Sequence, residues 1–186
     1  MGSSGLSPAA AGTADVLSAY AGTVTTSGTK TASTFVAQPD VPRNLVITPG
    51  GTTTDIETCV IRVNGTNYLS GTIYEDFAFA ANTASATTGV KAFKTVSSVV
   101  FPVDCESGSF GATWSAGYGE KIGLKNCMDF AGDWQSSEVG GVYETSRATI
   151  VADADEVEKN TADFNGTMTG SAAFIGHFIQ NFLCTY

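Results

Sequence analysis

Apolar and polar residues alternate along much of the chain after Leu45, and Gly-, Pro- and Asn-containing turns separate the alternating runs. One run, ETCVIRV, ends at Asn64-Gly65, a dipeptide typical of two-residue hairpin turns. In the return segment TNYLSGTIYEDFAFA (66–80), a period of two places Ile73, Glu75, Phe77 and Phe79 on one side and Tyr74, Asp76 and Ala78 on the other. This segment is predicted to form a half-buried antiparallel strand, with Glu75 near its edge.

Further short apolar runs predict further strands. NLVIT (44–48) is stopped by PGG, and SSVVFPV (97–103) ends where Pro102 would break a central ladder. Strands at intervals of about 8 to 15 residues, without a convincing amphipathic helix, favour an all-β fold, an antiparallel β-sandwich or barrel. One short helical turn is expected in DADEVEKN (153–160), where Asp153 is a candidate cap for a turn that contains Glu156.

The first 40 residues differ in composition from the rest of the chain. They are rich in Gly, Ala, Ser and Thr and hold few large apolar side chains, so they cannot bury enough surface to offset the entropy of ordering on their own. We therefore expect residues 1–40 to form an extended N-terminal arm and residues 41–186 to form the β-sandwich or barrel domain. Pro39 and Pro42 bias their neighbours to extended geometry at the entry to that domain.

The charge balance argues against two classes of partner. The 186 residues include 9 basic and 18 acidic side chains, a net charge of -9, and the basic residues do not cluster. Direct nucleic-acid binding needs clustered Lys and Arg, so it is not expected. No apolar run reaches the ~18 residues that span a bilayer, and the first residues lack the pattern of a secretory signal, so synthesis in a cytoplasm is expected.

Four dispersed cysteines, Cys59, Cys105, Cys127 and Cys184, allow three disulfide pairings. They form no CxxC or Cys/His pattern, which disfavours a zinc site. Because a cytoplasm keeps thiols reduced, buried free thiols are the favoured interpretation, and late oxidation in a released particle is the alternative.

GYGEKIGL (117–124) looks at first like a phosphate-binding glycine loop. The third glycine of GxGxxG should fall at position 122, which is Ile122, and no helix is signalled after Gly123. We predict instead that Ile122 and Leu124 point the same way into the β core. Gly117 and Gly119 then mark a bend or a close backbone approach, with Glu120 and Lys121 at the rim.

Other candidate sites are each weak. His177, the only histidine, has no Gly-x-Ser-x-Gly elbow to pair with, so a packed or rim residue is favoured over catalysis. The acidic stretch is a solvated face or a calcium site, although it lacks the EF-hand glycine and closing glutamate. Carboxylate pairs for glycoside hydrolysis and aromatics for a sugar platform are also available. The residues concerned are Asp153, Asp155, Glu156, Glu158 and Asp163 in the acidic stretch, Glu75 with Asp76 and Asp129 with Asp133 as pairs, and Trp114, Tyr118, Trp134 and Tyr143 as aromatics. We assign no catalytic, cofactor-binding or metal-binding residue and expect neither a cofactor nor an enzyme.

Five stretches, taken together in their order and spacing, resemble small structural proteins encoded in the head modules of tailed bacteriophages. They are VPRNLVITPGGTTTDI, VNGTNYLSGTIYEDFAF, TTGVKAFKTVSSVVFP, GYGEKIGL and ADADEVEKNTADFNGTMTGSA, and they span about residues 41 to 173. Within that family the fourth stretch looks like a recurrent strand-turn element, matched here by Gly117, Gly119, Glu120, Lys121, Gly123 and Leu124.

The resemblance implies a virion component, a capsid decoration or cement protein on the capsid surface after synthesis in the bacterial cytoplasm. Its partners would be the major capsid protein and copies of itself, as a homotrimer, without direct contact to nucleic acid or membrane. Residues 1–40 would drape over the major capsid protein or an adjacent subunit. The alternatives are a phage tail-tube or other tail structural protein, and a carbohydrate-binding module that uses Trp134 and Tyr143.

Overall fold

The structure is a computed structural model that describes residues 6–21, 28–108 and 111–178. Within these ranges it is all-β, as expected, with antiparallel strands and four short 3-10 turns. The strands are β1 (Leu17–Tyr20), β2 (Thr29–Ala32), β3 (Arg43–Gly51), β4 (Cys59–Thr66), β5 (Thr72–Phe79), β6 (Thr87–Thr88), β7 (Thr95–Pro102), β8 (Ala112–Gly123), β9 (Trp134–Val139), β10 (Val142–Tyr143), β11 (Thr149–Val151), β12 (Thr161–Asp163) and β13 (Phe174–Phe178). The turns are η1 (Thr53–Asp55), η2 (Val103–Cys105), η3 (Ala131–Asp133) and η4 (Val157–Lys159).

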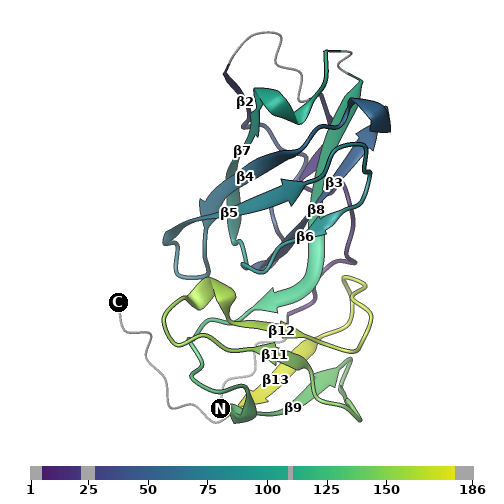
Figure 1. Cartoon of the computed structure of the whole chain (residues 1–186). Helices are drawn as coiled ribbons and strands as arrows, with labels where there is room; N and C mark the ends of the chain where they lie inside the picture. The colour runs from purple at the N-terminus through teal and green to yellow at the C-terminus, as the bar shows by residue number, and fades with distance from the viewer. Residues whose placement is uncertain (1–5, 22–27, 109–110, 179–186) are drawn as a thin grey trace.

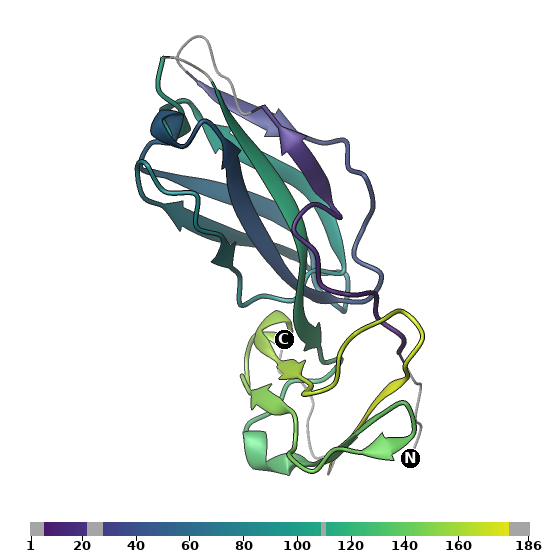
Figure 2. The ribbon, with the colours of Figure 1, turned by 90° about the vertical axis from the view of Figure 1, so that its right-hand side faces the viewer.

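The described strands form three sheets. The largest has the order β11-β12-β8-β3-β6, with β1 also paired to β8, and the others have the orders β2-β7-β4-β5 and β10-β9-β13. Figure 1 and Figure 2 show an elongated molecule with one β body above the other, and β8 running from the upper body into the lower one. The upper body is a sandwich, in which the β1, β3 and β8 strands face the β2-β7-β4-β5 sheet.

Each body has its own hydrophobic core. The first core, in the upper body, includes Phe77, Phe101 and Trp114, and the second core, in the lower body, includes Trp134 and Phe164. Aromatic rings meet edge to face in both, with centroids 4.9 Å apart for Phe79 and Trp114 and 5.8 Å apart for Trp134 and Phe164. The continuous strand β8 connects these two separately packed cores. We call the region between them the junction.

GYGEKIGL lies in β8 at this junction, so it is a strand and not a phosphate loop. Tyr118 belongs to the first core and Ile122 to the second. Between these two residues the pairing with β3 shifts. Leu45 pairs with Tyr118 and Arg43 pairs with Ile122, so a step of two residues along β3 matches a step of four residues along β8. This bulge bends β8 from one core into the other.

The side chain of Asn44 fills the bulge. Its Oδ1 accepts the Lys121 N–H at 2.9 Å, and its Nδ2 donates to the Gly89 carbonyl at 3.0 Å. A Cβ on Gly119 would lie 2.2 Å from the Asn44 Oδ1, and one on Gly117 would lie 1.9 Å from the Gly12 carbonyl oxygen. The prediction of a bend and a close backbone approach at these glycines is confirmed.

We expect Gly117→Ala to destabilise the protein by about 1–3 kcal/mol, because the added methyl must push the backbone of residues 12 and 13 off β8. Equilibrium unfolding in denaturant measures the change. Gly108→Ala is the matched control, since nothing lies within 4 Å of a Cβ there. Equal stability of the Gly117 variant and the wild type would contradict this account of the close approach.

Arg43 is the other residue that ties the junction together. Its side chain is fully buried, and its guanidinium donates to the Gly119 carbonyl from Nε at 2.9 Å and to the Ala9 carbonyl from a terminal nitrogen at 3.0 Å. It also pairs with Asp40 at 3.1 Å and lies 5.0 Å from the centre of the Tyr118 ring. One side chain therefore holds β8, the N-terminal segment and the start of β3 together.

The N-terminal segment is extended, but its described residues pack on the chain's own body. β1 pairs with β8, and β2 pairs with β7 in the other sheet of the upper body. Val16, Leu17 and Ala32 are buried in the first core. The expectation of an arm that cannot bury apolar surface is corrected for residues 6–20 and 28–32, because they complete both sheets at their edges instead of ordering alone.

Two local expectations also changed. The β4–β5 hairpin exists, but Asn64-Gly65 lies inside β4, and the turn comes later, where Asn67 Oδ1 accepts the Leu69 and Gly71 N–H groups. Gly65 serves instead for close approach to β7, since a Cβ there would meet the Thr95 carbonyl oxygen. β3 continues through the PGG sequence to Gly51. β7 ends at Pro102, as predicted.

The favoured interpretation of free thiols is wrong for three of the four cysteines. Cys59 and Cys105 form a disulfide with a Cα–Cα distance of 5.0 Å. Cys127 is disulfide-bonded as well, and Cys184 lies outside the described residues. Sequence spacing alone could not show this, because β4 and β7 bring positions 59 and 105 together only by pairing in the sheet.

Candidate interaction surface

The outward side of strands β4 and β5 forms an exposed face, which we call the β4–β5 face, consisting of Val60, Arg62, Tyr74, Asp76 and Ala78. The residues lie opposite one another in the antiparallel ladder, with Arg62 paired to Asp76 and Val60 to Ala78. Half of the Val60 and Tyr74 surface is accessible, at 50% and 53%. The prediction that Tyr74, Asp76 and Ala78 share the outer side, opposite Ile73, Phe77 and Phe79, is confirmed.

An ion pair fixes the centre of the β4–β5 face. The Arg62 guanidinium donates to both Asp76 oxygens, from Nε at 2.6 Å and from Nη2 at 2.7 Å, and it lies 4.3 Å from the centre of the Tyr74 ring. Arg62 lowers the pKa of the Asp76 carboxyl, and the same hydrogen bond raises the pKa of Arg62. A planar ring, a fixed ion pair and flanking aliphatic groups make a flat surface suited to protein contact, since Tyr and Arg are enriched in interfaces.

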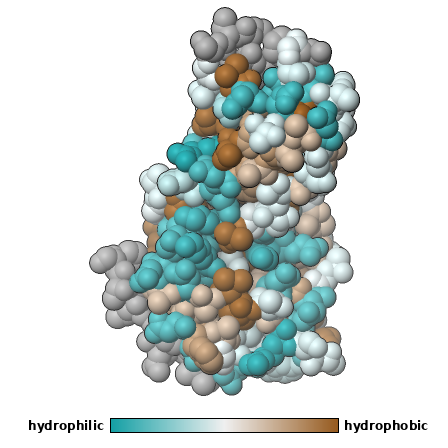
Figure 3. All heavy atoms as spheres, in the orientation of Figure 1, coloured by the Kyte–Doolittle hydropathy of each residue, from teal (hydrophilic) through white to brown (hydrophobic). Residues whose placement is uncertain are grey.

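Figure 3 shows the molecule from the side used in Figure 1. Brown, hydrophobic residues form separate spots among teal and white ones, and they do not merge into a continuous patch. A mixed surface of this kind fits a non-obligate contact better than a permanent, core-like one.

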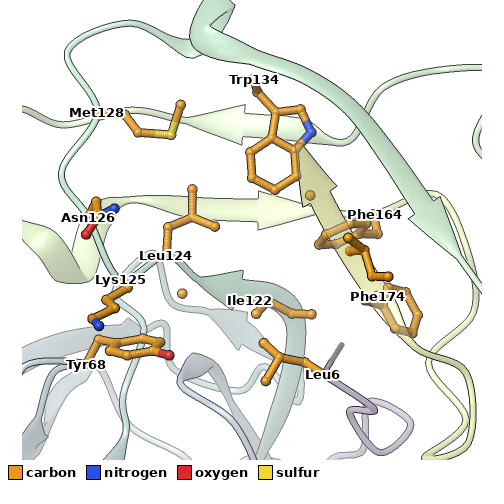
Figure 4. A pocket seen from close by; sticks show the side chains of 13 residues that line it. Leu6, Tyr68, Ile122, Leu124, Lys125, Asn126, Met128, Trp134, Phe164 and Phe174 are labelled. Atoms are coloured by element: carbon orange, nitrogen blue, oxygen red, sulfur yellow. The ribbon is translucent and has the colours of Figure 1, made fainter. Parts of the chain in front are cut away.

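A cavity of about 220 Å³ lies in the second core (Figure 4). The Ile122 and Leu124 side chains both point into it, from the end of β8 and the residue after β8, which confirms the predicted direction of GYGEKIGL. Trp134 lines the cavity from β9, Phe164 lines it from the loop after β12, and Phe174 lines it from β13. Its lining is mostly apolar.

The aromatic candidates do not form a sugar platform. Trp114 and Trp134 are buried, with 0% and 2% of their surface accessible, and Tyr118 is buried as well. Only Tyr143 is exposed. Trp134 therefore cannot form an exposed platform with Tyr143, because its indole packs inside the second core and donates from Nε1 to Ser137 Oγ at 3.0 Å.

His177 lies on the rim of the β10-β9-β13 sheet. Its Nε2 is 3.0 Å from Glu138 Oε1, and its ring centre is 5.9 Å from that of Tyr143. A hydrogen bond with Glu138 raises the pKa of Tyr143. This is the rim position that the sequence favoured for His177.

The acidic stretch is organised by hydrogen bonds and ion pairs. Asp153 Oδ1 accepts the N–H groups of Asp155 and Glu156, as expected for a cap, although the 3-10 turn itself begins at Val157. Glu156 pairs with Lys159 at 2.7 Å and with Lys91 at 3.1 Å. The backbone hydrogen bond from Glu156 lowers the pKa of Asp153, and Lys159 lowers that of Glu156. Among the described residues no three His, Cys, Asp or Glu side chains are placed to hold a metal ion.

One of the two carboxylate pairs is not arranged for a shared reaction. Glu75 and Asp76 point to opposite sides of β5, since Glu75 bonds the Val90 N–H at 2.6 Å while Asp76 pairs with Arg62 on the outer face. Burial raises the pKa of Glu75. Asp129 is exposed in the loop before η3, and Asp133 ends that turn.

Comparisons with known protein families, curated proteins and solved structures found no match. None of the helical turns in the described part of the chain is long and apolar enough to cross a membrane.

Proposed function

We propose that this chain is a virion structural protein, a capsid decoration or cement protein that binds the outer surface of a bacteriophage capsid and stabilises contacts between capsomers. Its partners in this proposal are the major capsid protein and two further copies of itself. The proposal gives the chain no catalytic role. It rests on the resemblance of the stretches between about residues 41 and 173 to head-module proteins.

One structural observation supports the proposal most directly. The β4–β5 face presents exposed Val60 and Tyr74 around the Arg62–Asp76 pair on a rigid sheet, which is a surface suited to contact with another protein. A sheet backed by the first core keeps such a face flat without an ordering cost on binding. Many copies on a lattice would add avidity to a contact that is modest on its own.

Imaging of particles assembled with and without the protein tests the proposal. We expect density on the outer shell that is lost when the protein is absent and that returns when purified protein is added to expanded capsids. Complete shells with missing or defective tails would overturn it and favour the tail alternative, as would assembly of the purified protein into hexameric rings.

Tyr74→Ala is expected to weaken binding to expanded capsids about tenfold or more, because a central interface tyrosine commonly supplies over 1 kcal/mol. Co-sedimentation with capsids measures the binding. Tyr143→Ala is the matched control, since Tyr143 is similarly exposed, at 63%, but lies on the lower body. If both variants bind like the wild type, the β4–β5 face is not the contact, while the imaging result still decides the proposed function itself.

A further inference from the structure

Three side chains from distant parts of the sequence meet where the upper body adjoins the lower one. Asn67 opens the turn between β4 and β5, Lys91 precedes β7, and Glu158 lies in η4. Figure 1 shows the η4 turn directly below the β4–β5 hairpin. Asn67 and Glu158 are buried, with 9% and 8% of their surface accessible, and 21% of the Lys91 side chain is exposed.

One carboxylate joins the other two groups. Glu158 Oε2 accepts a hydrogen bond from Asn67 Nδ2 at 3.1 Å, and Glu158 Oε1 lies 3.2 Å from Lys91 Nζ. The Lys91 amine and the Asn67 amide nitrogen therefore contact the same carboxylate, which can accept a proton from either group. Within a mostly buried setting, such charge-assisted contacts are stronger than they are in water.

The Asn67 carbonyl is polarised from its other side. Oδ1 accepts the backbone N–H of Leu69 at 3.1 Å and that of Gly71 at 2.9 Å. The turn fits closely around the amide, since a Cβ on Gly71 would lie 3.1 Å from Nδ2. Two fixed backbone donors on one carbonyl oxygen are the arrangement that stabilises a developing oxyanion.

We propose that Lys91 and Asn67 form an intramolecular isopeptide bond, with Glu158 as the group that carries protons between them. This inference does not depend on the proposed function. It makes Asn67 the electrophile, Lys91 the nucleophile and Glu158 the general acid–base.

The reaction balances without an oxidant or any other reagent. Glu158 takes a proton from the Lys91 ammonium, and the neutral amine attacks Asn67 Cγ, which places negative charge on Oδ1 beside the Leu69 and Gly71 N–H groups. Glu158 then protonates Nδ2, the Cγ–Nδ2 bond breaks, and the second Nζ proton leaves through the same carboxylate. The products are a Lys91–Asn67 amide and one ammonium ion, and Glu158 returns to its ionised form.

Glu156 acts against this reaction. It forms a second ion pair with Lys91 at 3.1 Å. Burial lowers the pKa of Lys91, but the hydrogen bonds and charges of Glu156 and Glu158 outweigh burial and raise it. Because only the neutral amine attacks, Glu156 holds Lys91 in its unreactive form, whereas Glu158 is needed for the proton transfers. The two acids are thus distinguishable by mutation.

The intact mass of the full chain, unfolded and reduced, tests the proposal. We expect the wild type to weigh less than its sequence requires by one ammonia molecule, and a digest to contain a branched peptide joining positions 67 and 91. Lys91→Arg and Glu158→Gln should each restore the full mass. Glu156→Gln should keep the cross-link and form it several times faster after refolding.

Lys94→Arg is the matched control, because Lys94 lies three positions along and donates to Ser70 Oγ in the same turn, at 3.1 Å. It should keep the mass deficit. Ammonia loss at an Asn-Gly sequence gives the same mass change but does not need Lys91. A mass deficit that persists in Lys91→Arg would therefore overturn the proposal. A wild type that retains its full mass after prolonged incubation in the folded state would also overturn it.

Discussion

Arg43→Ala is expected to lower the free energy of unfolding by about 3–5 kcal/mol, the cost typical of removing one partner from a buried charged network. The side chain is fully buried, and truncation leaves the Gly119 and Ala9 carbonyls without their donors. It also leaves a cavity beside the Tyr118 ring at the junction of the two cores. Arg43→Lys should recover only part of the loss, because an ammonium cannot reproduce the fork of donors.

Denaturant unfolding measures this loss, and amide hydrogen exchange locates it. The Gly12 N–H, bonded to the Tyr118 carbonyl, and the Gly123 N–H, bonded to the Pro42 carbonyl, should lose protection first. Arg62→Ala is the matched control, because that ion pair is exposed and should leave stability unchanged within error. Similar stability of the two variants would show that Arg43 does not hold the junction.

Several strands were predictable because their signal is local. A period of two in residues 73–79 separates buried Phe77 from exposed Tyr74, and neither assignment needs knowledge of the rest of the fold. The direction of Ile122 and Leu124 followed from the same alternation. Pro102 ends β7 because a residue without an N–H cannot continue a ladder, which is again a property of one position.

The features at the junction were not predictable because their causes are distant in sequence. Arg43 follows a proline in a polar stretch and looks solvent-exposed, yet it is buried by Gly119 and Met168. Asn64-Gly65 has a strong turn signal, but the side chain of Asn67 makes the turn and pairing with β7 keeps Gly65 in the strand. The contact of Asn67 with Glu158 joins positions 91 residues apart. Local patterns carry no information about such partners.

The order of the N-terminal segment was also not predictable from its own residues. Because the segment holds few large apolar groups, we expected that it could not order on its own. That argument treats the segment as if it were isolated from the rest of the chain. In the structure β1 and β2 gain hydrogen bonds from β8 and β7, strands already ordered by the first core. A small-residue segment that pairs with a preformed edge needs little apolar surface of its own, so composition alone underestimates its order.

Replacing both Cys59 and Cys105 with alanine is expected to lower the free energy of unfolding by about 4 kcal/mol. The bond closes a loop with a sequence separation of 46, and in the chain-entropy account a loop of that size restricts the unfolded chain by about this amount. Both residues are buried, at the start of β4 and in the turn after β7, so the native pairing of those strands already brings them together. The variant should therefore keep its fold while losing stability.

Denaturant unfolding with and without a thiol reductant separates this bond from the one at Cys127. The reductant should lower the stability of the wild type more than that of the Cys59→Ala/Cys105→Ala variant, in which only the Cys127 bond remains to be broken. If the alanine variant unfolds at the same denaturant concentration as the wild type, the disulfide adds no stability, and the strand pairing of β4 with β7 accounts for the order of this region by itself.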